Sequence, residues 1–473
     1  MREERGFKRD NMKKTAEFLS ILMKAALVIF SLFNTATIFI NIITGTHGTQ
    51  AVVYFSIMLI SLTIMISVVF SRCNFNKIYV ILMVGFILRA LWILNANTYP
   101  VSDYYTMYSA AGEVVAGNFS AFWGTNYMAR FPHLTVMTLY MAVMRLVFGS
   151  FDVMTMKFIN LLLGTLNIYL IYLLSIRLNG ENSKRGAYIT ASLAAVFPPF
   201  ITYTGILCPE NIAITFYILS MIMFFSYLEN NKPTCLPLCG IILAIGSLFR
   251  TVGIVILIGY MMYMTIYSDL RASAKVKNIF KIIIPYFFVI LSVSSLLQFC
   301  GVTQYPLWDG YEPNSTNVLK GVNFETGGKW SEDDGEFVMK YLDDADMLDR
   351  MCKERIVRRL SDKSLYEICN FFGGKLSSQW TSGDSGGTFW TKISSKEGFL
   401  YVPADEYNFL PFQLFCAIMY IVFITGIIRN KSKKLNLIYI IFGGYISLFC
   451  ITEFQPRYSM AAMYIMLLTE TYS

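Results

Sequence analysis

The chain has 473 residues, of which 55% are hydrophobic and only 15% are charged, and its mean hydropathy is +0.51. Soluble domains carry about 25% charged residues, so this composition excludes an ordinary soluble protein and indicates a membrane protein. The formal net charge of +8 does not indicate nucleic-acid binding. Many of the Lys and Arg residues lie in short segments between apolar runs, as expected of cytoplasmic loops.

Apolar stretches between short polar breaks predict about 12 transmembrane α-helices, since a helix crosses a hydrocarbon core of roughly 30 Å with about 20 residues. Transmembrane β-strands would instead alternate in hydrophobicity over about ten residues. The basic N-terminus precedes an apolar run without a small-residue cleavage site, which favours a retained first span. The predicted spans are approximately 17–44, 51–70, 77–95, 153–177, 186–205, 210–228, 234–250, 252–268, 277–299, 406–428, 434–452 and 457–472.

A shorter apolar run, residues 133–149, decides the orientation of all later spans. If it crossed the membrane, the basic loops near residues 177–185, 271–277 and 429–434 would lie outside. If it lies in the interface, all three loops are cytoplasmic, as the positive-inside rule requires. We therefore expect a juxtamembrane helix, which suits a run that is interrupted by Arg145. The first loop (96–132) and the segment 301–405 then share the extracytoplasmic face.

The segment 301–405 has a different composition, rich in Asp, Glu and Trp. Residues 338–360 have apolar side chains at helical spacing, and the glycine-rich stretch 383–387 predicts a loop. Cys352 and Cys369 could pair, although their separation in sequence does not show it. We expect an all-α polytopic membrane protein in three parts: a transmembrane module (1–300), a small, mainly helical extracytoplasmic domain (301–405) and C-terminal transmembrane helices (406–473).

Charged residues gather near the predicted outer ends of the spans. Asp103 follows the third span and opens a short helix, where it is equally well explained as an N-cap. Glu453 and Arg457, with Tyr458, occupy a tight proline-containing turn between the last two spans, which is an expensive place for charge. Arg250 either snorkels to lipid phosphate or binds an anionic ligand.

Three further residues complete this set: Arg130 at the end of the first loop, Glu210 after the stretch Phe197-Pro198-Pro199-Phe200, and Lys329 in a glycine-rich loop. That loop is equally well explained as a plain solvated loop. One acid, Asp103, and several cations thus converge on one membrane face. This layout suits the transfer of a group from an anionic lipid to a hydroxyl.

The pattern Pro100-x-Ser102-Asp103-x-x-x-x-Tyr108-x-x-Ala111, followed by an apolar helix that ends at Phe148-Gly149, resembles the bacterial membrane glycosyltransferases of the GT-C superfamily. These enzymes are related to the protein O-mannosyltransferases and the lipid A aminoarabinose transferases. The later segments of the chain agree in order: Phe197-Pro198 with Glu210, Phe249-Arg250, the loop 321–333 and Glu453-x-x-x-Arg457-Tyr458.

The resemblance implies inverting transfer of a sugar from a polyprenyl-phosphate carrier to a hydroxyl of a cell-envelope glycan, lipid or protein, at the outer face of the cell membrane. Asp103 would be the general base. The substrate-binding residues would be Arg130, Glu210, Arg250, Lys329, Glu453, Arg457 and Tyr458. Many relatives have Asp-Glu at the catalytic position, whereas Tyr104 follows Asp103 here; this leaves a second acidic role, if any, to Glu113 or Glu210, and we expect neither metal nor cofactor.

Three other functions compete with this hypothesis. A flippase or transporter for lipid-linked sugars would have polar residues near mid-span, and the nearest cases are Lys157, Asn160 and Asn167. A polysaccharide polymerase would also have a large outer loop and arginines, but it would not require Asp103 just after the third span. A structural membrane subunit would need none of these residues for chemistry.

Overall fold

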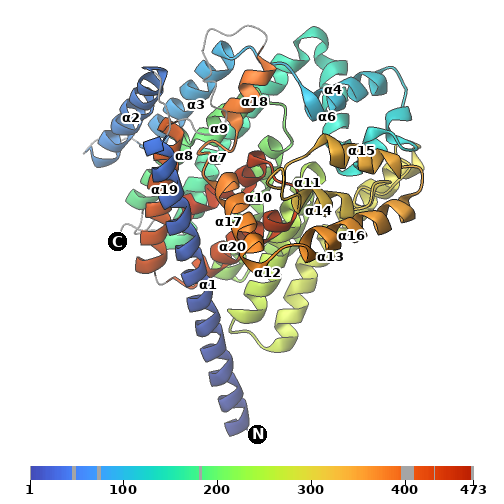
Figure 1. The fold of residues 1–473 in the computed structure, drawn as a ribbon. Coiled ribbons are helices and arrows are strands. Elements are labelled where there is room, and N and C mark those ends of the chain that lie inside the picture. Colours follow the sequence, from blue (N-terminus) through green and yellow to red (C-terminus); the bar gives the residue numbers. More distant parts are fainter. Residues whose placement is uncertain are drawn as a thin grey trace.

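The computed structural model describes residues 2–44, 49–71, 76–180, 184–395, 410–430 and 432–469. Across these ranges the chain forms a helical bundle without a β-strand, and the N-terminal half of the first helix projects from the bundle (Figure 1). The long helices are α1 (Arg2–Thr44), α2 (Thr49–Phe70), α3 (Ile78–Asn95), α7 (Asp152–Asn179), α8 (Lys184–Val196), α10 (Glu210–Asn230), α11 (Cys235–Phe249), α12 (Ile254–Ile266), α13 (Ala272–Phe299), α19 (Leu410–Arg429) and α20 (Leu435–Ile451).

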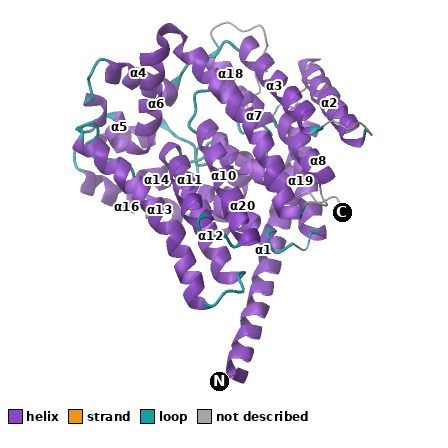
Figure 2. Cartoon of the chain, turned by 180° about the vertical axis from the view of Figure 1, so that it is seen from behind, coloured by secondary structure: helices purple, strands orange, loops and turns teal. Residues whose placement is uncertain are grey.

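Within the described ranges, six helical stretches are long and apolar enough to cross a membrane, and four shorter apolar helices accompany them. These stretches coincide with ten of the predicted spans, which identifies an all-α, multi-pass membrane protein. Figure 2, seen from behind, shows the same helical architecture with loops at both ends of the bundle.

The two remaining predicted spans are not regular helices. The stretch 186–205 is broken at Phe197, because proline cannot continue α8; it is followed by α9 (Pro198–Thr202) and η5 (Tyr203–Gly205). The stretch 457–472 folds as η7 (Pro456–Ser459), α21 (Met460–Met463) and η8 (Tyr464–Thr469), with residues 470–472 outside the described part. Residues 459–469 are all buried, so their apolar character reflects packing inside the protein.

The break after α8 leaves backbone carbonyl groups without helical partners, and such groups inside a membrane protein must be satisfied by other donors. Polar side chains of α3, of α7 and of Thr98 in the loop after α3 supply them. Arg89 donates to Ala194 O (3.3 Å) and Ala195 O (3.0 Å), Trp92 to Thr202 O (3.1 Å), Thr98 to Gly205 O (2.6 Å) and Asn160 to Ile206 O (3.1 Å). The broken segment is therefore held in place immediately before Glu210.

The first loop forms α4 (Ser102–Val115), α5 (Tyr127–Arg130) and, after η2 (Pro132–Leu134), α6 (Thr135–Phe148). Helices α4 and α6 lie side by side (Figure 1). Arg145 of α6 donates to Tyr108 O at 2.7 Å, and the Tyr108 hydroxyl donates to Asp152 at 2.7 Å. Arg145, which interrupts the apolar run 133–149, thus links α6 to α4.

The polar segment, which we define as residues 301–395, contains α14 (Ser315–Gly321), α15 (Glu332–Lys340), α16 (Ala345–Ser361), α17 (Leu365–Trp380) and α18 (Gly387–Ser394). The single helix predicted over 338–360 is wrong, because Asp344 caps a new helix there by accepting from Met347 N. Cys352 is buried and Cys369 exposed, and both are free thiols.

The polar segment has two kinds of packing. Its first half has a small core of its own, made of Leu319, Val338, Leu342, Leu348 and Cys352. Its second half joins the main core: Trp380 at the end of α17 is fully buried against Phe30, Phe442 and Phe449. The segment is thereby anchored to the first helix and to α20.

Candidate active site

Asp103 is the second residue of α4. The N-cap position is Val101 and no side chain caps this helix, so the N-cap explanation of Asp103 is wrong. The carboxylate accepts a hydrogen bond from the Tyr127 hydroxyl (2.9 Å to Oδ1) and another from the Arg457 guanidinium (3.1 Å to Oδ2). The Asp103 side chain is nevertheless 31% exposed. Its orientation is therefore fixed while it stays accessible to a ligand.

Arg457 lies in η7, in the turn that follows α20. It donates to Asp103, 354 residues away in sequence, and its other amino group donates to the Tyr104 hydroxyl at 2.9 Å. Its guanidinium carbon lies 5.4 Å from the ring centres of Tyr104 and Tyr458 and 5.5 Å from that of Trp390. Aromatic faces attract cations, so these rings hold the guanidinium on the sides that Asp103 leaves free.

The two tyrosines beside Asp103 remain protonated at neutral pH. Burial, reinforced by the negative charge of Asp103, raises the pKa of Tyr127 well above its ordinary value. Burial likewise raises the pKa of Tyr104. Tyr127 can therefore act as a permanent hydrogen-bond donor to the carboxylate.

A second acid–base pair lies next to the first. Glu210 begins α10 and Arg250 ends α11, and their side chains meet at 3.1 Å while being only 3% and 12% exposed. The Arg250 guanidinium lies 4.9 Å from the ring centre of Tyr458, which also faces Arg457. Tyr458 thus separates two arginines, each of which is paired with a carboxylate.

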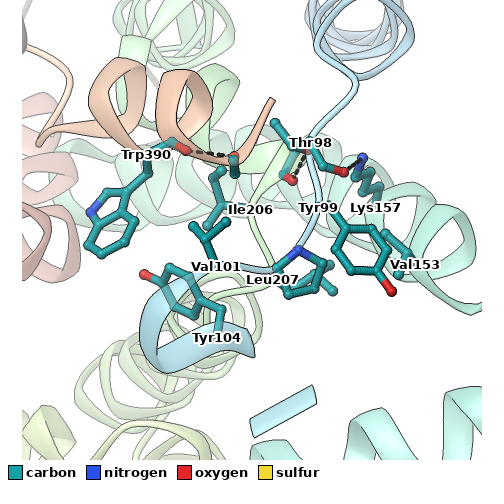
Figure 3. A pocket seen from close by; sticks show the side chains of 12 residues that line it. Thr98, Tyr99, Val101, Tyr104, Val153, Lys157, Ile206, Leu207 and Trp390 are labelled. Carbon is teal, nitrogen blue, oxygen red and sulfur yellow. Dashed lines mark hydrogen bonds between the residues drawn. The ribbon is translucent and has the colours of Figure 1, made fainter. Parts of the chain in front are cut away.

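A small pocket lies beside α4 (Figure 3). Lys157 points at the carbonyl oxygen of Thr98 from one side, at 2.5 Å, while Tyr104 and Trp390 lie on the other. Two of the three polar residues that a transporter would place near mid-span are engaged here: Lys157 holds the chain that leads to Asp103, and Asn160 holds the broken segment. The side-chain oxygen of the third, Asn167, is buried without a hydrogen-bond partner among the described residues.

A larger groove, with a volume of about 560 Å³, lies between α11, α12 and α13 and the start of the polar segment. We call the part lined by Arg130, His133 and Glu312 the polar end of the groove, and α13 contributes apolar side chains to the lining. The groove lining includes Arg130, His133, Glu312, Leu248, Ile254, Phe287, Leu291 and Trp308. His133 is within electrostatic range of Arg250, Arg457 and Asp103, so the polar end borders the two acid–base pairs.

The structure thus brings Asp103, Glu210, Arg250, Arg457 and Tyr458 together. Three predicted residues lie at the margin. Arg130 is in the groove wall, paired with Glu312 at 2.5 Å. Lys329 lies over the ring of Phe454 at 5.6 Å, and the buried Glu453 accepts from Gln455 at 3.0 Å.

Sequence reasoning missed Tyr127, Trp390 and Arg89. Tyr127 lies on another helix of the first loop, and Trp390 is far from Asp103 along the chain; no local pattern distinguishes either residue. Arg89 could have been found, because a charged residue inside an apolar run is a signal of a buried polar contact.

Comparison with known proteins bears on this arrangement. Residues 133–297 match the model of the dolichyl-phosphate-mannose-protein mannosyltransferase family. The resemblance to the GT-C membrane glycosyltransferases is thereby confirmed. The match to this family model runs from η2, just before α6, into α13. It includes Glu210 and Arg250, whereas Asp103 and Arg457 lie outside it. No curated protein matches the sequence.

Among solved structures, the chain is similar to the oligosaccharyltransferase of Archaeoglobus fulgidus in its apo form, with a TM-score of 0.47 and 13% identity over 83% of this chain and 49% of that one. The archaeal oligosaccharyltransferase AglB of the same organism, in complex with an inhibitory peptide and a dolichol-phosphate, gives a TM-score of 0.46 and 14% identity over the same shares. This chain spans about half the length of these structures.

Proposed function

We propose that this protein is an inverting glycosyltransferase that moves a sugar from a polyprenyl-phosphate carrier to an acceptor hydroxyl, with Asp103 as general base. The observation that carries the proposal is the state of Asp103: its carboxylate is oriented by Tyr127 and Arg457 and is still accessible. A general base must reach the proton that it removes, and it must be held in one orientation to do so efficiently.

In the proposed reaction, Asp103 takes the proton of the acceptor hydroxyl as that oxygen attacks the anomeric carbon. The bond between this carbon and the phosphate oxygen breaks, and the electron pair stays with the polyprenyl phosphate. Fixed cations beside the phosphate stabilise its developing negative charge. Arg457 and Arg250 are the nearest, with Arg130 at the polar end of the groove.

The groove beside α13 suits a lipid-linked donor. Ile284 and Phe288 of α13 are 62% and 68% exposed, as expected of a helix that faces lipid, and Phe287 and Leu291 line the groove itself. An isoprenoid chain can therefore enter from the membrane along an apolar wall and place its phosphate at the polar end. The volume of the groove is within the range of small-ligand sites, which is roughly 300–1,000 Å³.

We further propose that the site faces the extracytoplasmic side. Asp152 and Glu210, at the beginnings of α7 and α10, lie at the same end of the bundle as Asp103. At the other ends of these helices, Arg177 and Glu229 pair at 2.8 Å, and Lys434 also pairs with Glu229 at 2.8 Å. The basic loops thus gather opposite the site, as the positive-inside rule expects of the cytoplasmic face.

The same geometry supports the proposal that α6 is a juxtamembrane helix. His133, just before α6, borders the site, and Asp152, just after it, is bonded to Tyr108 of α4. Both ends of α6 therefore lie on the same face of the bundle. Its outward residues Val143 and Leu146 are 52% and 72% exposed, which suits a helix that rests in the membrane interface.

The proposal is tested by Asp103→Asn in purified protein reconstituted in nanodiscs. The donors are polyprenyl-phosphate sugars, a cell-envelope extract supplies acceptors, and released polyprenyl phosphate is measured. We expect the rate to fall about 10²–10⁴-fold, the usual contribution of a general base. The control is Glu354→Gln, an exposed acid of α16 outside the proposed site, which should leave the rate unchanged. Asp103→Asn at a near wild-type rate would refute the role of Asp103 and favour a transporter or scaffold.

A further inference from the structure

The turn that carries Arg457 is held by the polar segment. Phe454 N donates to Gly328 O at 2.6 Å, and Glu453 N donates to the side-chain oxygen of Asn317 at 2.8 Å. The backbone of residues 453–454 thus contacts α14, which contains Asn317, and the loop before α15, which contains Gly328. The position of the turn therefore depends on a part of the chain that precedes it by more than a hundred residues.

Lys375 of α17 makes the strongest of these connections. Its ammonium group donates to three carbonyl oxygens: Gly321 O at 2.6 Å, Cys450 O at 2.8 Å and Thr452 O at 2.6 Å. Two of these carbonyls lie at the C-terminal end of α20, where a helix has unsatisfied acceptors and favours a cation. The third belongs to α14. One buried side chain thus joins α17, α14 and α20.

Two glycines of the polar segment pack closely against the end of α20 and against Lys375. A Cβ atom at Gly321 would lie 2.4 Å from Ile451 O and 2.6 Å from the Thr452 carbonyl carbon. A Cβ atom at Gly328, which has a φ of +83°, would lie 3.0 Å from the Lys375 side chain. Glycine at these two positions lets the polar segment approach the end of α20 closely enough for the ammonium group to bridge them.

We propose that Lys375 is a positioning residue: it holds the turn 452–457 so that Arg457 reaches Asp103, and it thereby couples the polar segment to the active site. The catalytic consequence of this inference rests on the proposed function. The three hydrogen bonds of Lys375, which we call the clamp, do not depend on it. Lys375 touches neither Asp103 nor Arg457. Its effect passes through the four residues between Thr452 and Arg457, which connect the end of α20 to η7.

The experiment compares Lys375→Met, Lys375→Gln and Lys353→Met in the full chain in nanodiscs. Met removes every donor with little change in size, whereas Gln keeps two N–H donors. Lys353 is the matched control, an exposed cation of the same segment that pairs only with Asp349. Hydrogen–deuterium exchange of peptides covering 452–459 reports on the turn, and kcat and KM of sugar transfer report on the site.

We expect faster exchange at 452–459 in Lys375→Met, a smaller change in Lys375→Gln and none in Lys353→Met. The kcat should fall in the same order, by about 10- to 100-fold for Met, the effect of a misplacement of roughly 1 Å in an active site. The KM for the donor should change less than kcat, because Lys375 itself does not line the groove.

Unchanged exchange at 452–459 in Lys375→Met would refute the clamp. Faster exchange with an unchanged kcat would refute the positioning role. If the wild-type protein transfers no sugar, the proposed function fails, while the exchange measurement still decides whether Lys375 holds the turn. If Lys375→Met does not fold, the Gln variant provides both readouts.

Discussion

Replacing Gly321 by alanine tests the contact on which the Arg457 turn depends. In most helices this change is favourable by up to about 1 kcal/mol, because alanine has the higher helix propensity. Here the new methyl group would lie 2.4 Å from Ile451 O and 2.6 Å from the Thr452 carbonyl carbon, which are backbone atoms that cannot rotate away. Overpacking of this kind costs about 1–3 kcal/mol. We therefore expect a net loss of about 1–2 kcal/mol.

The matched control is Gly373→Ala, in the middle of α17, where a Cβ atom has nothing within 4 Å. The same chemical change should there raise stability by about 0.5–1 kcal/mol. Thermal unfolding in nanodiscs should thus give midpoints that move in opposite directions for the two variants. Sugar transfer should fall only in Gly321→Ala, since only this variant displaces the turn.

Two results would contradict this reasoning. If Gly321→Ala is as stable and as active as the wild type, the close approach between α14 and the end of α20 does not position the turn. If Gly373→Ala is equally destabilised, the cause is a general need for glycine in these helices and not the contact.

Three further predictions concern the site and its supports. Tyr127→Phe removes a hydrogen bond to the Asp103 carboxylate and should lower kcat/KM about tenfold or more without changing the unfolding midpoint; an unchanged rate would show that the bond has no catalytic role. Arg250→Met leaves the buried Glu210 without its partner and should cost about 3–5 kcal/mol, part of which Glu210→Gln should restore in the double variant; equal instability of single and double variants would contradict this. Burial raises the pKa of Asp384 from 3.8 to about 6, so the folded state binds this proton more tightly than the unfolded chain. Its contribution to stability is fully present below pH 4 and falls by up to about 3 kcal/mol as the pH rises through 6; unfolding midpoints of the wild type and Asp384→Asn that share one pH dependence would refute it.

The sequence by itself determined the class of the protein and most of its helices. A transmembrane helix is recognised from a local property, a sufficient length of apolar residues. Ten of the predicted spans therefore coincide with apolar helical stretches, six of which are long enough to cross a membrane. The break in the predicted span 186–205 was also visible in Pro198, whose effect on a helix is local. The irregular fold of residues 457–469 was not visible, because an apolar run buried in protein has the same composition as one that faces lipid.

For the site, the sequence identified charged residues in unusual places, and Asp103, Glu210, Arg250 and Arg457 do lie together. Their pairing could not be read from the sequence, because each contact joins segments that are far apart in the chain. Asp103 and Arg457 are 354 residues apart, and Lys375 bonds to carbonyls 54, 75 and 77 residues away.

The physical reason for this division is the range of the forces involved. Hydrophobic length and proline sterics act within one segment, so they leave a pattern in the sequence. Hydrogen bonds and ion pairs act over about 3 Å, so the partners of Asp103 were decided only when the tertiary fold brought the first loop, α5 and the last turn together.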